Sequence, residues 1–171
     1  MAENHSKRIA LYGMLTAAAL VFGYVEYLVP LNFIAPGVKL GIANGIILLL
    51  ILKEKFKEAI YINIVRILLS ALLFSTPFSL VFSLTAGIIS TAVMCLSGRF
   101  KKVGVIGISV LGGTVHNLTQ LCVAYFTVGS GVWFYLPLLL IAGLIAGCAV
   151  GILVWIILER FEKNKVNFLK L

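Results

Sequence analysis

The sequence predicts an all-α integral membrane protein, built as a bundle of six transmembrane helices. Of its 171 residues, 61% are apolar and only 12% are charged, and the mean hydropathy is +1.12. A soluble domain is about half apolar and about a quarter charged, so this chain lacks the polar surface that water requires. Its apolar runs are separated by short basic clusters, as in multi-pass proteins of the cell membrane.

Six apolar runs are candidate spans, and together they predict a single membrane domain over residues 1–171. The first run resembles a signal peptide where it begins, but no small-residue cleavage site follows, so we expect a retained helix. The apolar part of the second is shorter than the roughly 20 residues of a full crossing. The predicted spans cover 9–29, 37–52, 57–74, 78–97, 103–128 and 132–158, and 159–171 form a charged cytoplasmic tail.

The basic residues predict the orientation of these spans. Twelve of the fourteen Lys and Arg residues lie at the N-terminus and after the second, fourth and sixth runs. The opposite loops, around 30–36, 75–77 and 129–131, contain none. Because cytoplasmic loops are enriched in Lys and Arg, we expect both termini in the cytoplasm. The net charge of +8 is thereby explained without nucleic acid.

Polar side chains inside the predicted spans mark a candidate solute site, because such groups are costly in a bilayer. With a rise of about 1.5 Å per residue, most of them converge between the midplane and the outer leaflet. Their helical spacing also places Asn63 with Arg66, and His116 with Gln120, on shared faces. We predict a cavity open to the outside and lined by Glu26, Lys39, Asn44, Asn63, Arg66, His116, Asn117 and Gln120.

Each of these residues also has a purely structural interpretation. Arg66 could pair with Glu26 or with backbone carbonyls to hold the bundle together. His116 could donate to a neighbouring carbonyl, and Asn44 and Asn63 could join helices by hydrogen bonds. Lys39 and Glu26 would then be a structural pair rather than a gate.

Small residues at every fourth position predict smooth helix faces. Such a face allows close packing within the bundle, or it serves as a docking surface for a partner. Gly13 and Ala17 begin a similar face in the first run. The two complete stripes are Gly37, Gly41 and Gly45 in the second run and Gly143, Gly147 and Gly151 in the sixth.

No pattern of residues predicts catalysis, a metal site or a cofactor. The cysteines Cys95, Cys122 and Cys148 are dispersed and lie in apolar runs, as free packing thiols do. Ser109 and His116 are two helical turns apart, beyond the reach of a nucleophile and its base. The chain has no aspartate, which disfavours enzymes that bind Mg²⁺-diphosphate through aspartate-rich motifs, and no P-loop.

Two motifs, PGVKLGIAN at 36–44 and HNLTQL at 116–121, resemble the bacterial Gx transporter family, also labelled heptaprenyl diphosphate synthase component I. In size, span count and topology that family is similar to the substrate-binding S-components of energy-coupling factor (ECF) transporters. The resemblance implies an S-component-like bundle whose first helix docks on a scaffold subunit driven by two ATPases. The implied docking face includes Gly13, Ala17 and Ala18. The implied pocket draws on Lys39, Asn44, Arg66, His116, Asn117 and Gln120.

The leading hypothesis is therefore a non-enzymatic, substrate-binding subunit that transports a small vitamin-like, anionic or amphipathic solute. The alternative is a non-transporting membrane subunit that docks on a redox partner, in flavin- or quinone-linked extracellular electron transfer or in isoprenoid-quinone metabolism. Synthesis of a prenyl diphosphate by this chain alone is disfavoured, because the sequence has no aspartate.

Overall fold

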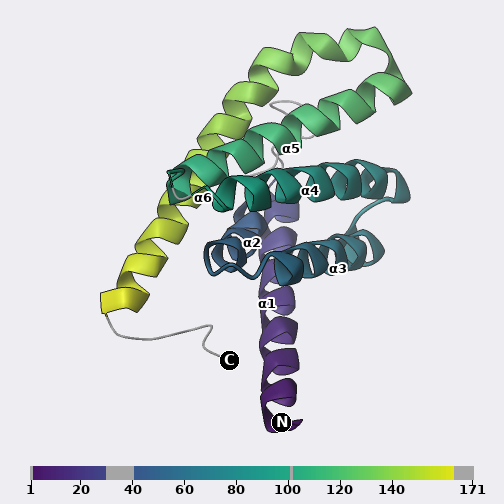
Figure 1. Cartoon of the computed structure of the whole chain (residues 1–171). Coiled ribbons are helices and arrows are strands. Elements are labelled where there is room, and N and C mark those ends of the chain that lie inside the picture. Colours follow the sequence, from purple (N-terminus) through teal and green to yellow (C-terminus); the bar gives the residue numbers. More distant parts are fainter. Residues whose placement is uncertain (1, 30–40, 101, 164–171) are drawn as a thin grey trace.

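The computed structural model describes residues 2–29, 41–100 and 102–163, and within these ranges the chain forms helices joined by short turns, with no strand (Figure 1). The elements are α1 (Ala2–Leu28), α2 (Ile42–Leu52), α3 (Phe56–Phe74), α4 (Pro77–Gly98), α5 (Val105–Val128), the short 3-10 helix η2 (Ser130–Tyr135) and α6 (Leu136–Lys163). The six α-helices lie on the six apolar runs of the sequence, and the bounds of α3 and α4 differ from the predicted ones by at most one residue.

The residue directly before α2 has a left-handed backbone conformation. Gly41 precedes the helix with a φ of 75°, a left-handed conformation that favours glycine because a side chain would be strained there. This residue therefore shapes the turn into α2 rather than a packing face, which corrects its predicted place in a stripe. Gly37 and Lys39 lie outside the described residues. The first helix also differs from its prediction. α1 begins at Ala2, whereas the predicted first span begins at residue 9.

α6 begins later and ends later than predicted. Pro137 has no amide hydrogen and fits the first turn of a helix, so the chain before it forms the separate helix η2 instead of the first turn of the sixth span. At the other end, α6 continues to Lys163, into the predicted tail. Lys163 and Glu159 form an ion pair of 3.0 Å one turn apart, which supports this extension.

Among the residues that the structure describes, four helical segments are apolar and long enough to cross a membrane: Ser6–Leu28, Pro77–Gly98, Val105–Val128 and Ser130–Lys163. Large apolar side chains cover the outside of these segments; Phe126 and Phe134, for example, are 84% and 90% exposed. So much exposed apolar surface is unfavourable in water, whereas lipid chains can cover it. The protein is therefore a membrane protein.

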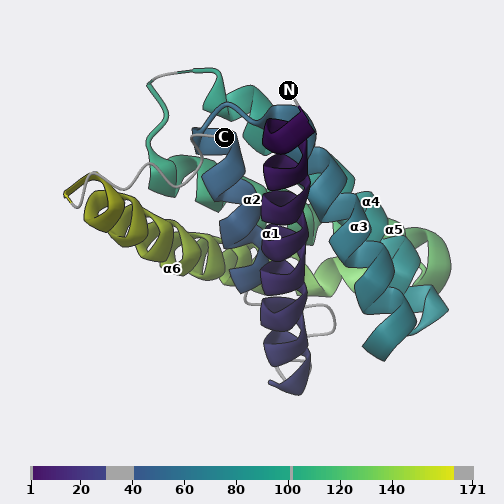
Figure 2. The same cartoon turned by 90° about the horizontal axis from the view of Figure 1, so that it is seen from below.

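The short helix α2 lies at the centre of the molecule. Its 11 residues pack against all five other α-helices, and Figure 2 shows it between α6 and α3. Ile47, Leu48, Leu50 and Ile51 are almost completely buried. A helix that is apolar on every side is stable only when it is surrounded, which explains its central position.

α5 and α6 pack closely through the predicted glycine stripe of the sixth run. A Cβ atom on Gly147 would lie 2.6 Å from the Cα of Val110 in α5, and one on Gly151 would lie 2.8 Å from the Cα of Ile106. A Cβ atom on Gly143 would lie 3.0 Å from the carbonyl oxygen of Gly113 in α5. The stripe is therefore buried in the bundle, which favours the packing interpretation over a docking surface.

Gly45 of the other predicted stripe also serves internal packing. A Cβ atom on it would lie 3.3 Å from Val154 and 3.5 Å from Val150, so α2 approaches α6 closely at this point. Of the two described glycines in that stripe, Gly41 and Gly45, Gly45 lies in a contact between helices.

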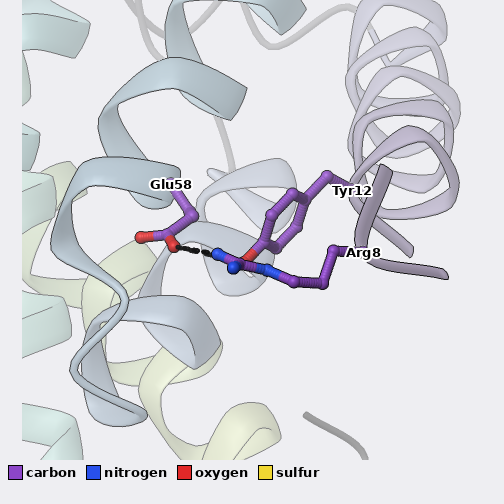
Figure 3. A network of polar contacts seen from close by, with 3 residues as sticks. All are labelled: Arg8, Tyr12 and Glu58. Atoms are coloured by element: carbon purple, nitrogen blue, oxygen red, sulfur yellow. Dashed lines mark hydrogen bonds and ion pairs between the residues drawn. The ribbon is translucent and has the colours of Figure 1, made fainter. Parts of the chain in front are cut away.

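α1 crosses α3 and is fastened to it near its N-terminal end (Figure 3). Arg8 and Tyr12 of α1 both reach Glu58 in the first turn of α3, at 3.5 Å for the ion pair and 3.2 Å for the tyrosine hydroxyl. Between this contact and the centre of the molecule, α1 exposes its small residues Gly13 and Ala17.

Candidate functional site

A cavity of about 1010 Å³ lies among α1, α3, α4, α5 and α6, beside the first turn of α2. This volume is at the upper end of the range for sites that bind small molecules and cofactors. Asn63 lies behind the wall of the cavity, and Lys39 lies outside the described residues. The other predicted ligand residues line it: Glu26, Asn44, Arg66, His116, Asn117 and Gln120.

The character of the lining changes along the helices. Along α5, Ser109 and Gly112 come first, His116 and Gln120 follow, and Ala124 comes near the C-terminal end. The cavity therefore has small groups beside the first half of α5, a polar band beside His116 and Gln120, and a third part, the aromatic end, beside the end of α5. Both rings and hydroxyl groups line this aromatic end: Tyr27, Phe74, Phe78, Phe82 and Tyr135, with Ser75, Thr76, Ser79 and Ser83.

Arg66 is held in the polar band by two side-chain amides. Its Nη2 donates to Asn63 Oδ1 at 2.6 Å and to Asn44 Oδ1 at 3.2 Å. Hydrogen bonds with a charged donor are short and strong, so they fix the guanidinium group firmly. Among the described residues no carboxylate forms an ion pair with Arg66, so the structural pair of Arg66 with Glu26 is not formed.

Asn63 also joins α3 to α4. Its Nδ2 donates to the carbonyl oxygen of Gly87 at 3.1 Å and to Thr91 Oγ1 at 2.8 Å, and the side chain is buried. Asn63 therefore uses its amide nitrogen for helix packing and its oxygen for Arg66. It positions the guanidinium group rather than lining the cavity.

Glu26 caps a helix that belongs to another part of the chain. Its Oε1 accepts a hydrogen bond of 2.9 Å from the backbone N–H of Ala43, in the first turn of α2. The first amides of a helix have no partner inside it, and a carboxylate is favourable there. Since Gly41 has no side chain to cap α2, Glu26 of α1 performs this role at the edge of the cavity.

Asn117 and Gln120 of α5 differ in their hydrogen bonds. Asn117 Nδ2 donates to the carbonyl oxygen of Leu139 at 2.9 Å and so links α5 to α6. Gln120 is buried and lines the cavity, and its Oε1 accepts no hydrogen bond from the residues that the structure describes. Arg66 Nε in the same polar band is a buried donor that likewise has no partner among the described residues. Leaving a buried polar atom unsatisfied costs roughly 1–3 kcal/mol, so these two atoms mark the least satisfied part of the band.

The predicted ligand set did not include the serine and phenylalanine residues that line the cavity at the end of α3 and the start of α4. Ser79 and Ser83 are one turn apart in α4 and so share a face, and Ser75, in the turn before α4, reaches Ser79 with a hydroxyl contact of 3.4 Å. Phe78 and Phe82 are likewise one turn apart in α4, whereas Phe74 is the last residue of α3. Serine and phenylalanine at every fourth position in the fourth apolar run were the available signal.

Ring contacts hold the aromatic end of the cavity together. The ring centroids of Phe78 and Phe82 are 4.9 Å apart. Phe74 contacts Tyr24 at 5.4 Å and Tyr27 at 5.5 Å, which ties the end of α3 to the end of α1.

The three cysteines are free and lie on different helices, α4, α5 and α6. Over residues 2–29, 41–100 and 102–163, no group of three or more His, Cys, Asp or Glu side chains is placed to hold a metal ion.

Comparison with known proteins identifies the family. No curated protein and no solved structure matches the chain. The family model described as heptaprenyl diphosphate synthase component I matches residues 15–157, a range that includes both sequence motifs and all of the described cavity lining. The chain therefore belongs to the heptaprenyl diphosphate synthase component I family, which is the Gx transporter family.

Proposed function

We propose that this chain is the substrate-binding subunit of a membrane transporter for a small solute. The observation that carries the proposal is the cavity of about 1010 Å³, in which the fixed guanidinium group of Arg66 lies in one polar band with His116 and Gln120. A large cavity with a few convergent polar groups is the usual form of a small-molecule site.

The proposed role is binding and transport, not catalysis. Arg66 and the amides around it can hold a polar group, and the aromatic end can hold an apolar one. The family's description mentions a synthase, an activity that we do not assign to this chain. No cofactor or metal is part of the proposal.

In the membrane we propose six spans with both termini in the cytoplasm of a bacterial cell. The distribution of basic residues supports this orientation. The described part of the second proposed span, the 11-residue helix α2, is shorter than a full crossing. α3 carries Lys57, Glu58 and Arg66 and would cross with the guanidinium group facing the cavity rather than lipid.

The proposed partners are an ECF scaffold subunit and its ATPases, reached through α1. Gly13 and Ala17 are exposed on α1, Ala18 is partly covered, and a Cβ atom on Gly13 would meet nothing within 4 Å. This open small-residue face suits close docking of another helix.

The alternative function, a subunit docked on a membrane redox partner, depended on the glycine stripes as docking surfaces. The stripe of α6 packs on α5, as Gly147 against Val110 illustrates, so it offers no free face. Transport is therefore the better supported of the two functions.

The test is native mass spectrometry of the protein extracted gently from its own membranes. We expect a discrete small molecule on the wild type that is lost from Arg66→Ala. Arg8→Ala is the matched control, because it removes an arginine of α1 that contacts Glu58 and does not line the cavity. A wild-type protein that carries only lipids, or that copurifies with a redox subunit, would contradict the proposal.

A further inference from the structure

We infer that the surface formed by the turn between α2 and α3 and by the end of α4 binds the headgroup of an anionic phospholipid. This surface lies outside the cavity, so the inference is independent of the proposed transport function. It rests on a group of unpaired cations, on the contacts that hold this group together and on an apolar strip of α4 that ends beside it.

Five basic side chains gather where the end of α4 meets the turn between α2 and α3. We call them the basic patch: Lys53, Lys55, Lys57, Arg99 and Lys102. Its lysines all lie within three residues of Phe56 or Arg99, and the guanidinium carbon of Arg99 lies 5.5 Å from the centre of the Phe56 ring. A Cβ atom on Gly98 would lie 2.8 Å from Ile51 and 3.6 Å from Phe56. The patch is therefore one surface, assembled from two segments that are far apart in the sequence.

The positive charge of the basic patch has no carboxylate partner. None of its five side chains forms an ion pair within the part of the chain that the structure describes, and all except Lys55 are exposed. The nearby Glu58 is already occupied, because Arg8 contacts it at 3.5 Å and Tyr12 at 3.2 Å (Figure 3). Glu54 alone therefore stands against five cations, and such a surface attracts anions.

An apolar strip of α4 leads to the basic patch. Ile89, Ala92 and Leu96 follow the helical period on one face and are exposed, Leu96 to 57%. Phe100 follows Arg99 directly and is 60% exposed. α4 has the length and composition of a span, so lipid chains cover this strip. A phospholipid contacts both the strip and the patch, whereas inorganic phosphate or an acidic loop of a partner would use the patch alone.

Arg99 is the member of the patch best suited to a phosphate group. A guanidinium group donates two parallel hydrogen bonds to a phosphate, and a lysine cannot. The contact with the Phe56 ring already restrains Arg99, so less conformational freedom is lost on binding. The lysines around it add charge, and each basic residue near a membrane surface strengthens the binding of anionic lipid about five-fold.

The experiment measures lipid binding to the delipidated full-length protein by native mass spectrometry in detergent. The probes are phosphatidylglycerol and phosphatidylcholine with identical acyl chains, so that the headgroup is the difference between them. Inorganic phosphate is added as a competitor, which separates a lipid site from a site for soluble anions. The variants are Arg99→Gln and Lys102→Gln, each of which removes one exposed cation of the patch.

Arg160→Gln is the matched control, because it removes an exposed arginine from the last turn of α6. A Cβ atom on Gly151 would lie 2.8 Å from Ile106 in the first turn of α5. Arg160 is nine residues further along α6, about 13 Å beyond this contact. Figure 1 shows this end of α6 extending away from α2, α3 and α4. The control therefore changes the net charge equally without touching the basic patch.

We expect the wild type to bind phosphatidylglycerol about ten-fold or more tightly than phosphatidylcholine. Arg99→Gln and Lys102→Gln should each weaken the binding of phosphatidylglycerol about five-fold and leave that of phosphatidylcholine unchanged. Arg160→Gln should bind both lipids as the wild type does. Inorganic phosphate should not displace phosphatidylglycerol.

Equal binding of the two lipids by the wild type, or the same loss in Arg160→Gln as in Arg99→Gln, would overturn the inference. Displacement by inorganic phosphate would also overturn it and would assign the patch to soluble anions. Variants that bind lipid normally but lose a copurifying protein would assign it to a protein partner instead. If Arg99→Gln does not fold, Lys102→Gln and the headgroup preference of the wild type still decide.

Discussion

At the residue scale, several polar groups that are candidates for solute binding have a second role in holding the helices. Asn63 links α3 to α4 while it orients Arg66, and Asn117 links α5 to α6. The structural and functional interpretations of these residues are therefore compatible. A site built in this way is rigid, because several of the polar contacts that shape it also join two helices.

Glu26 gives the first testable consequence at this scale. Glu26→Leu removes the acceptor for the N–H of Ala43, and loss of a helix cap costs about 0.5–2 kcal/mol. Glu26→Gln keeps a side-chain oxygen and should lose less. We expect the order of melting temperatures in one detergent to be wild type, Glu26→Gln, Glu26→Leu. The control is Glu162→Leu, an exposed glutamate of α6; an equal loss in this control would refute the capping role.

At the element scale, the same residue type has opposite consequences on two helices. The glycines of α6 allow α5 to approach at backbone distance, whereas Gly13 of α1 faces open space. In the sequence, both helices have small residues at every fourth position. The difference arises from the helix that lies opposite each one.

A pair of alanine substitutions tests this contrast. In Gly147→Ala the new methyl group would lie 2.6 Å from Val110 Cα, so α5 and α6 must separate, and overpacking of this kind costs typically 1–3 kcal/mol. Gly13→Ala meets nothing within 4 Å and should stabilise α1 by about 0.5–1 kcal/mol, because alanine is the better helix former. Thermal unfolding of both variants measures the difference. Equal effects, or a stable Gly147→Ala, would show that the packing of α5 on α6 is looser than the structure has it.

At the scale of the whole molecule, the central question is how the six helices are placed in the bilayer. Four segments have the length and composition of spans, while α2 and α3 are buried or polar enough to need the other helices around them. A cavity bounded by both kinds of helix is possible only when the bundle assembles as a unit. We therefore expect the topology to follow the basic clusters rather than the hydropathy of each helix alone.

Cysteine labelling tests this topology in a variant without the three native cysteines. Ser130→Cys, in the turn between α5 and α6, should react with a membrane-impermeant maleimide on intact cells. Lys53→Cys and Lys102→Cys, after α2 and α4, should react only when the cells are permeabilised. All three positions are exposed, so accessibility within the protein does not limit the reaction. Labelling of Lys53→Cys on intact cells would mean that α2 does not lead the chain to the cytoplasm.

The sequence by itself determined the class of the protein, the number and approximate positions of its α-helices and most of the polar residues that meet in the cavity. These properties are local, because hydropathy and helical period depend on residues that are near one another in the chain. The family motifs at 36–44 and 116–121 likewise need no knowledge of the fold.

Only the tertiary structure decided what each residue contacts. Whether a glycine stripe is buried depends on the helix opposite it, as Gly147 and Gly13 show. The capping of α2 by Glu26, and the position of Asn63 behind Arg66, join segments that are far apart in the sequence. The start of α6 at Leu136 and the aromatic wall of the cavity were also decided by geometry. A periodic pattern states which residues share a face, but the partner of that face is chosen by the packing of the whole bundle.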